Sequence, residues 1–169
     1  MSIILFDNSQ RKRLWPLTQT KAVAALRMGM LTMMERWERL TGMQVFIHTE
    51  KYLQNLYGYA GADEHIWIDA SVIPDKALVD LVQSLDKNDC WADEYGLIVG
   101  KTHLSFEDFD AAQSLQYFEN IHDHAMVDRI QFPWDLIQWN DRILRFDFDV
   151  LTRGKTSAAI SSTNRCIHA

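Results

Sequence analysis

Apolar positions in the first half of the chain follow two different periods in turn, which predicts alternating strands and helices. Ile3–Phe6 is a continuous apolar run that ends at Asp7-Asn8, and such a run is typical of a strand buried on both faces. From Ala22 to Leu40 apolar residues recur at helical spacing, and Gly42 stands where the C-cap of that helix would fall. The pattern then predicts a strand at Gln44–Thr49 and a short helix at Lys51–Tyr57.

The same alternation continues in the second half. Pro74-Asp75 opens a predicted helix that runs through Leu85, because proline suits the first helical turn. Ser105–Asp108 resembles a capping box, which predicts a helix to about Phe118. Strands are expected at His65–Ala70, Tyr95–Val99 and Ala125–Ile130.

The segment Trp134–Leu151 fits both periods. LRFDFDV alternates as a strand would, whereas Ile137, Leu144, Phe148 and Leu151 also form a helical stripe. Gly154 follows shortly after the segment, and a glycine there favours the helix.

About five strand–helix alternations predict an α/β fold with three layers, in which helices cover both faces of a mostly parallel sheet. Ligands of such sheets bind beyond the carboxyl ends of the strands. The segments to consider are therefore Asp7–Arg13, Asp69–Ser71 and Gly100–His103. From Thr152 the residues become small and polar, so we expect one domain over residues 1–151 and a linker over residues 152–169.

Composition narrows the classes of function. The chain has 169 residues, of which 47% are hydrophobic and 24% are charged, and its net charge is −6. The basic residues do not gather into a long patch, which argues against general nucleic-acid binding. No apolar run approaches the length of a membrane span, and Cys90 and Cys166 lack metal-type spacing, so we expect a reduced, cytoplasmic protein without a membrane partner.

The stretch from Ile3 to Thr18, IILFDNSQRKRLWPLT, resembles the signature of the sugar-phosphate nucleotidyltransferases. Arg13 aligns with the signature arginine, and Pro16-Leu17-Thr18 aligns with the Pro-Leu-Thr that follows it. The whole chain is also similar to a divergent branch of this superfamily, which forms the N-terminal part of proteins similar to the bifunctional N-acetylglucosamine-1-phosphate uridyltransferases. That similarity is carried by Leu26–Thr32 (LRMGMLT), Phe132–Asp135 (FPWD) and the tail from Leu151.

The resemblance implies a nucleotide-diphospho-sugar transferase (Rossmann-like) fold and transfer of a nucleotidyl group from a nucleoside triphosphate to a sugar 1-phosphate. It makes Arg13 the expected catalytic residue. The residues expected to contact substrate are Arg11, Lys12, Thr18, Lys21 and Arg27. It also implies that the tail leads toward a left-handed β-helix, which this chain does not contain and through which oligomers could form.

The resemblance further implies a magnesium ion. Relatives place an aspartate after a central strand, and Asp69 stands close to that position. Asn140-Asp141-Arg142 resembles a later motif that supplies a second ligand, so Asp69, Asn140 and Asp141 are the expected ligands.

Two departures from the family pattern leave a second hypothesis open. Asp7–Arg11 replaces the glycine-rich turn, and Val23 stands at the position of the family lysine. The alternative is therefore a catalytically degenerate module that binds ligands or serves as a scaffold. On that reading the basic cluster at 11–13 is a solvated surface, Asp69 caps a loop, and residues 140–142 are the exposed face of a helix.

Overall fold

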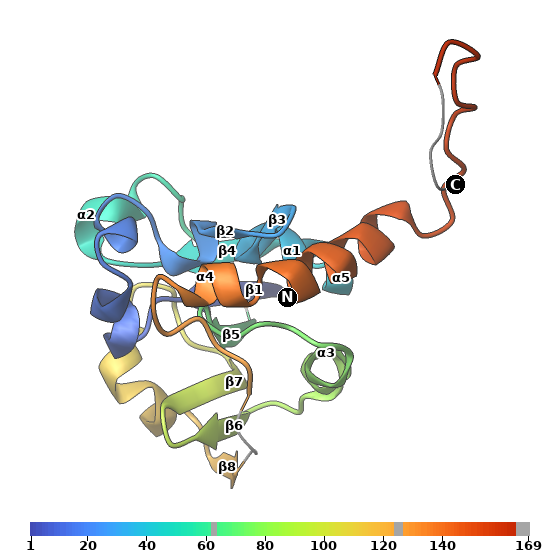
Figure 1. Cartoon of the computed structure of the whole chain (residues 1–169). Helices are drawn as coiled ribbons and strands as arrows, with labels where there is room; N and C mark the ends of the chain where they lie inside the picture. Colours follow the sequence, from blue (N-terminus) through green and yellow to red (C-terminus); the bar gives the residue numbers. More distant parts are fainter. Residues whose placement is uncertain (62–63, 124–126, 165–169) are drawn as a thin grey trace.

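A computed structural model describes residues 1–61, 64–123 and 127–164 of the chain. Its main sheet has six strands in the spatial order β4-β1-β5-β7-β6-β8 (Figure 1). The strands are β1 (Ser2–Phe6), β4 (Val45–His48), β5 (His65–Asp69), β6 (Asp89–Asp93), β7 (Gly96–Thr102) and β8 (Asn120–Asp123).

The sheet is mixed and mostly parallel. β1 pairs in parallel with β4 and β5, and β6 pairs in parallel with β8. β7 runs antiparallel to both of its neighbours, β5 and β6. The predicted α/β fold with a mostly parallel sheet is therefore confirmed.

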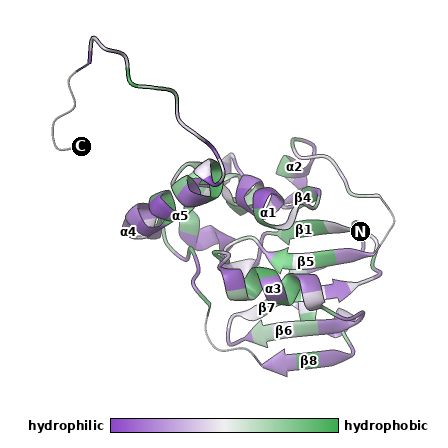
Figure 2. Ribbon diagram, turned by 90° about the vertical axis from the view of Figure 1, so that its right-hand side faces the viewer, coloured by the Kyte–Doolittle hydropathy of each residue, from purple (hydrophilic) through white to green (hydrophobic). Residues whose placement is uncertain are grey.

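Both faces of β1 are buried, as its continuous apolar run predicts. Ile3 and Leu5 face one core with the helices α1 (Met33–Thr41), α3 (Lys76–Ser84) and α5 (Asn140–Thr152). Ile4 and Phe6 face a second, mainly aromatic core, which includes Trp67. Figure 2 shows α1, α3 and α5 beside the stacked strands.

On the second face of the sheet, turns and a 3-10 helix stand where an α-helix was predicted. The predicted helix from Ser105 to Phe118 is wrong, because this segment forms turns and the 3-10 helix η4 (Ala111–Tyr117). The Ser105 hydroxyl donates to the Asp108 carboxylate at 2.8 Å, so no backbone cap forms at that point. The carboxylate of Asp110 accepts instead from the backbone of Ala112 and begins η4.

The predicted helix at Ala22–Leu40 is correct only in its second half. α1 begins after Thr32, whose side chain forms a complete capping box with Glu35, and it ends at Gly42 with φ +69°, as predicted. Residues 23–32 instead form the 3-10 helix η3 (Val23–Ala25) and a hairpin of β2 (Arg27–Met28) and β3 (Leu31–Thr32).

The ambiguous segment near the C-terminus is helical. It forms α4 (Asp135–Gln138) and α5, and the helix interpretation is confirmed. On α5, Asp147 is fully buried and makes a two-bond ion pair with the equally buried Arg36 of α1. Its carboxylate also accepts from the backbone of Met30 and Leu31, which fixes the hairpin against α5.

Two other predictions need adjustment, and one strand was missed. The short helix expected at Lys51–Tyr57 ends earlier, as α2 (Lys51–Gln54). β6 was not predicted, because only two of its residues face the interior. Of the strand expected at Ala125–Ile130, residues 125–126 lie outside the described residues, and Arg129 forms an isolated antiparallel bridge with Val72.

Residues 153–164 are exposed and extend away from α5 (Figure 2). Within the described part of the chain, no helix combines the length and apolarity that crossing a bilayer requires.

Candidate functional site

The turn after β1 is a 3-10 helix, η1 (Ser9–Leu14), in place of an open glycine loop. Asn8 begins it, because its side-chain oxygen accepts from the backbone N–H of Gln10 at 2.8 Å. This turn lies at the carboxyl end of β1, the edge of the sheet where ligands are expected.

Arg11 is buried within this turn and has partners for most of its donors. Its Nε donates to the Asp7 carboxylate at 2.8 Å, and Nη2 donates to the carbonyl groups of Thr18 and Lys21 and to the Tyr52 hydroxyl. The Thr18 side chain is also fully buried and donates to the Arg11 carbonyl. Both residues therefore hold the turn together in this structure, and contact with substrate would require these bonds to break.

Asp7, the partner of Arg11, connects three segments. Its carboxylate accepts from the backbone N–H of Val23 at 2.9 Å and from the Thr49 hydroxyl at 2.5 Å. Burial raises the pKa of Asp7, although these hydrogen bonds and the Arg11 charge act in the opposite direction.

The other predicted cations are exposed. Lys12, Arg13 and Lys21 lie on the surface around η1, and the Arg13 guanidinium lies 5.7 Å from the centroid of the Phe132 ring. Arg27 lies on the hairpin, where it donates to the Met30 carbonyl and pairs with Glu35 at 3.4 Å. Arg13 and Lys12 are therefore the cations of η1 that can reach a phosphate without breaking a buried bond.

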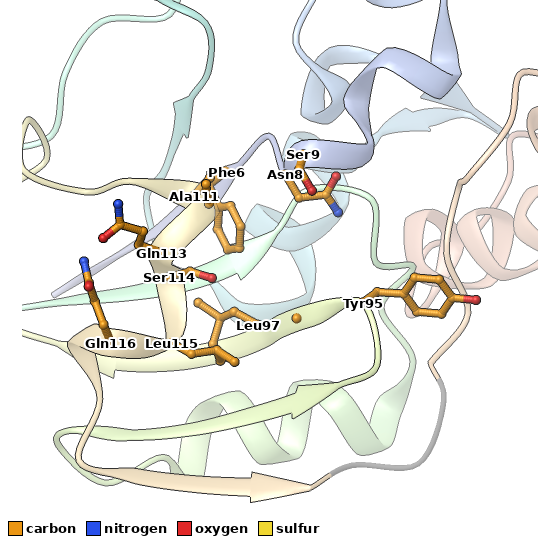
Figure 3. Close-up of a pocket in the computed structure, with 12 residues that line it drawn as sticks. Phe6, Asn8, Ser9, Tyr95, Leu97, Ala111, Gln113, Ser114, Leu115 and Gln116 are labelled. Atoms are coloured by element: carbon orange, nitrogen blue, oxygen red, sulfur yellow. The ribbon is translucent and has the colours of Figure 1, made fainter.

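A cavity of about 320 Å³ adjoins this turn. Asn8 and Ser9 form one side of it, the start of β7 forms a second side, and residues 111–116 of η4 form a third. Figure 3 shows Phe6, Leu97 and Leu115 close together inside the cavity, with the amide side chains of Gln113 and Gln116 on one side and Asn8 on another. An apolar interior with a few amides and hydroxyls around it is typical of small-molecule sites, whose volumes start at roughly 300 Å³.

One of the three segments predicted to lie at the ligand edge does not lie there. Gly100–His103 was expected at the ligand edge, but β7 is antiparallel to β5, so its carboxyl end lies at the opposite edge. Tyr95 and the beginning of β7, Gly96 and Leu97, line the cavity instead. The direction of this one strand therefore removed Gly100–His103 from the ligand edge.

Asp69 lies at the predicted edge, at the end of β5, and is 1% exposed. Burial raises the pKa of its carboxyl group, although the Arg129 charge and hydrogen bonds from Ser71 and Asn8 lower it. Arg129 also donates to Asp93 at 2.8 Å, and its guanidinium lies 5.6 Å from the centroid of the Tyr95 ring.

Sequence reasoning missed Arg129, although one signal was present. A charged residue within a predicted strand requires a charged partner if the strand is buried. Arg129 stands in such a segment, and the two nearby carboxylates that pair with it are Asp69 and Asp93.

The structure gives each of the three expected magnesium ligands different partners. Asn140 accepts from the backbone N–H of Gly29 at 3.0 Å, and Asp141 pairs with Arg145 on the exposed surface of α5. Among the described residues, no group of three or more His, Cys, Asp or Glu side chains is arranged to hold a metal ion. This arrangement does not fit an ion held jointly by Asp69, Asn140 and Asp141.

A second cavity, of about 440 Å³, lies beside the end of β4. His48, Tyr59, Phe106 and Phe109 give it aromatic sides, with the His48 ring 5.0 Å from that of Phe106. Burial lowers the pKa of His48 to about 4, although the Asp110 charge raises it. The imidazole in this cavity is therefore neutral near pH 7.

Comparison with known proteins adds one positive finding. No curated protein matches the chain significantly. A family model described as sugar nucleotidyl transferase matches residues 3–156, which include all of the sheet except Ser2 of β1, the turn after β1, and α5. The chain therefore belongs to the sugar nucleotidyl transferase family.

Proposed function

We propose that the protein transfers a nucleotidyl group from a nucleoside triphosphate to a sugar 1-phosphate. In this reaction a phosphate oxygen of the sugar attacks the α-phosphorus, a new P–O bond forms, and the bond to the bridging oxygen breaks so that pyrophosphate leaves. The observation that carries the proposal is the cavity beside η1, which lies within the residues that the sugar nucleotidyl transferase family model matches.

The roles of the residues follow from their positions. Arg13 is exposed on η1, the helix whose first residue, Ser9, lines the cavity. It would contact the phosphates and stabilise the charge that grows on them during transfer. Gln113 and Gln116 offer amide groups that would select hydroxyl or base groups of the substrates.

A second candidate function has support from Arg11 and Thr18. Because their side chains are already bound within the protein, fewer groups are free to hold a triphosphate than the sequence alone indicates. A module that binds a nucleotide or sugar phosphate without turnover fits this arrangement.

Pyrophosphate release would separate the two functions. The full chain would be assayed with a panel of nucleoside triphosphates and sugar 1-phosphates in magnesium buffer, beside Arg13→Ala and Arg39→Ala. Arg39 is an exposed cation on α1 and serves as the matched control. We expect release by the native chain and by Arg39→Ala, and a loss of roughly 100-fold in Arg13→Ala.

Calorimetry with the same nucleotides completes the test. Nucleotide binding without pyrophosphate release would support the non-catalytic module. Absence of both binding and release, for every pair of substrates, would overturn both functions.

A further inference from the structure

The carboxylate of Asp69 has no lone-pair position left for a metal ion, because four hydrogen bonds already occupy it. A carboxylate offers about four lone-pair sites. Oδ1 accepts from the backbone N–H of Ser71 at 2.9 Å and from its hydroxyl at 2.8 Å. Oδ2 accepts from Asn8 Nδ2 at 2.7 Å and from Arg129 Nη1.

Arg129 lies between this carboxylate and a second one. One terminal nitrogen binds Asp69 and the other binds Asp93, and all three side chains are at most 4% exposed. The backbone holds Arg129 in place as well, because its residue bridges to Val72, which follows β5 closely. Two carboxylates from β5 and β6 thus converge on a single buried positive charge.

A divalent cation competes poorly for this position. Magnesium requires oxygen ligands at about 2.0–2.1 Å in near-octahedral geometry. To bind Asp69 it would have to displace Asn8 or Arg129, and it would stand beside a guanidinium whose like charge is poorly screened in a buried site.

We propose that the Arg129 guanidinium takes the place of a metal ion at this edge of the sheet, so that Asp69 and Asp93 bind a fixed side-chain cation and no divalent ion. Removing the guanidinium would leave two buried carboxylates facing one space, beside the hydroxyl oxygen of Ser71. Such a set of oxygen ligands suits a divalent cation.

Manganese binding tests this with a readout that is independent of activity. Mn²⁺ would be titrated into the full chain and followed by electron paramagnetic resonance, which measures free Mn²⁺. The variants are Arg129→Gln, the double variant Arg129→Gln/Asp69→Asn, and Arg142→Gln. Arg142 pairs with the exposed Asp128, so it is a matched control from a neighbouring ion pair.

We expect Arg129→Gln to bind Mn²⁺ roughly tenfold or more tightly than the native chain, and the double variant to lose that gain. Arg142→Gln should behave as the native chain does. Loss of one partner from a buried ion pair destabilises a fold strongly, so each variant would first be checked for folding by circular dichroism. A folded Arg129→Gln variant that gains no affinity would contradict the proposal.

The native chain provides a test that needs no variant to fold. Mn²⁺ broadens the amide resonances of residues close to it, so the Ser71 amide should broaden no more than those of Asp75 or Lys76 on the exposed start of α3. Preferential broadening at Ser71 would overturn the proposal. Neither measurement depends on turnover, so a chain without nucleotidyl transfer could still confirm this inference, and an active chain could still refute it.

Discussion

Buried arginines explain much of the difference between the expected and the observed site. Arg11 and Arg129 are at most 6% exposed, and Arg36 is fully buried. Each binds at least one carboxylate and contacts residues that are distant in sequence. Because an unpaired buried charge is costly, these contacts are strong constraints on the fold.

Also at the scale of single residues, the lowered pKa of His48 predicts how the stability of the fold depends on pH. The unfolded chain protonates this residue near its ordinary pKa of 6.5, whereas the folded chain does so only at about 4. The unfolded state therefore binds more protons between these values, and stability falls as the pH falls through this window. Below about pH 4 this contribution levels off.

The measurement is the free energy of unfolding of native and His48→Gln chains from pH 7.5 to pH 4.5. The native chain should lose roughly 1–3 kcal/mol relative to the variant as the pH falls. His103→Gln, which changes an exposed histidine, is the matched control. If the stability of the His48→Gln chain fell with pH as steeply as that of the native chain, the assignment would be refuted.

The sequence predicted correctly where Arg13 and Asp69 lie relative to the strands. Arg13 is exposed on the turn after β1, and Asp69 lies at the carboxyl end of β5, as the pattern of strands predicts. The sequence pattern did not show that Arg11 turns inward, because its neighbours Lys12 and Arg13 are exposed and nothing local distinguishes the three. Burial of Arg11 depends on Asp7 and Tyr52, one of which comes from beyond β4.

At the scale of elements, the hairpin of β2 and β3 shows how one spacing can have two structural causes. Leu26, Met28 and Leu31 are buried, as they would be on a helix, but Leu26 ends η3 and the other two belong to short strands. Gly29 adopts φ +70°, and Asp147 binds the backbone N–H groups of Met30 and Leu31. The partner comes from α5, more than 100 residues away, so a local pattern does not reveal it.

At the scale of elements, the contact of Gly29 with α5 predicts how a substitution there changes stability. A Cβ atom there would lie 2.7 Å from Asp147 Oδ2 and 3.2 Å from the backbone nitrogen of Leu144. Gly29→Ala should therefore combine left-handed backbone strain with a clash against α5. Gly42→Ala is the matched control, because Gly42 has a similar φ of +69° with nothing within 4 Å of the added atom.

Urea denaturation of both variants would measure the difference. Gly42→Ala should cost about 1–2 kcal/mol from strain alone, and Gly29→Ala should cost about 1–3 kcal/mol more from overpacking. Equal losses in the two variants would show that the hairpin does not press against α5 in solution.

For the molecule as a whole, alternating strands and helices were sufficient to predict the α/β class but not the direction of every strand. Parallel pairing of β1 with β4 and β5 follows from the intervening helices. β6 and β7 are joined by a short turn at Glu94-Tyr95, which makes their pairing antiparallel. Because β6 was not predicted, neither was the reversal that brings Tyr95 to the cavity.

The exposed segment after α5 leads to a prediction about truncation. Residues 157–164 are exposed, and the hydrogen bonds of Ser161, Thr163 and Asn164 are local. A chain that ends at residue 156 should keep its free energy of unfolding within about 0.5 kcal/mol of the full chain. Chemical denaturation checks this, and a larger loss would show that the tail packs on the domain.

The ion pair between Arg36 and Asp147 has a consequence for the order of events during synthesis. The guanidinium of Arg36 is made early, but its carboxylate partner lies 111 residues further along the chain. Until α5 leaves the ribosome, α1 and the hairpin would have to hold an uncompensated charge in their interface, which a folded intermediate tolerates poorly. We therefore expect this side of the sheet to close only when translation of the domain is nearly complete.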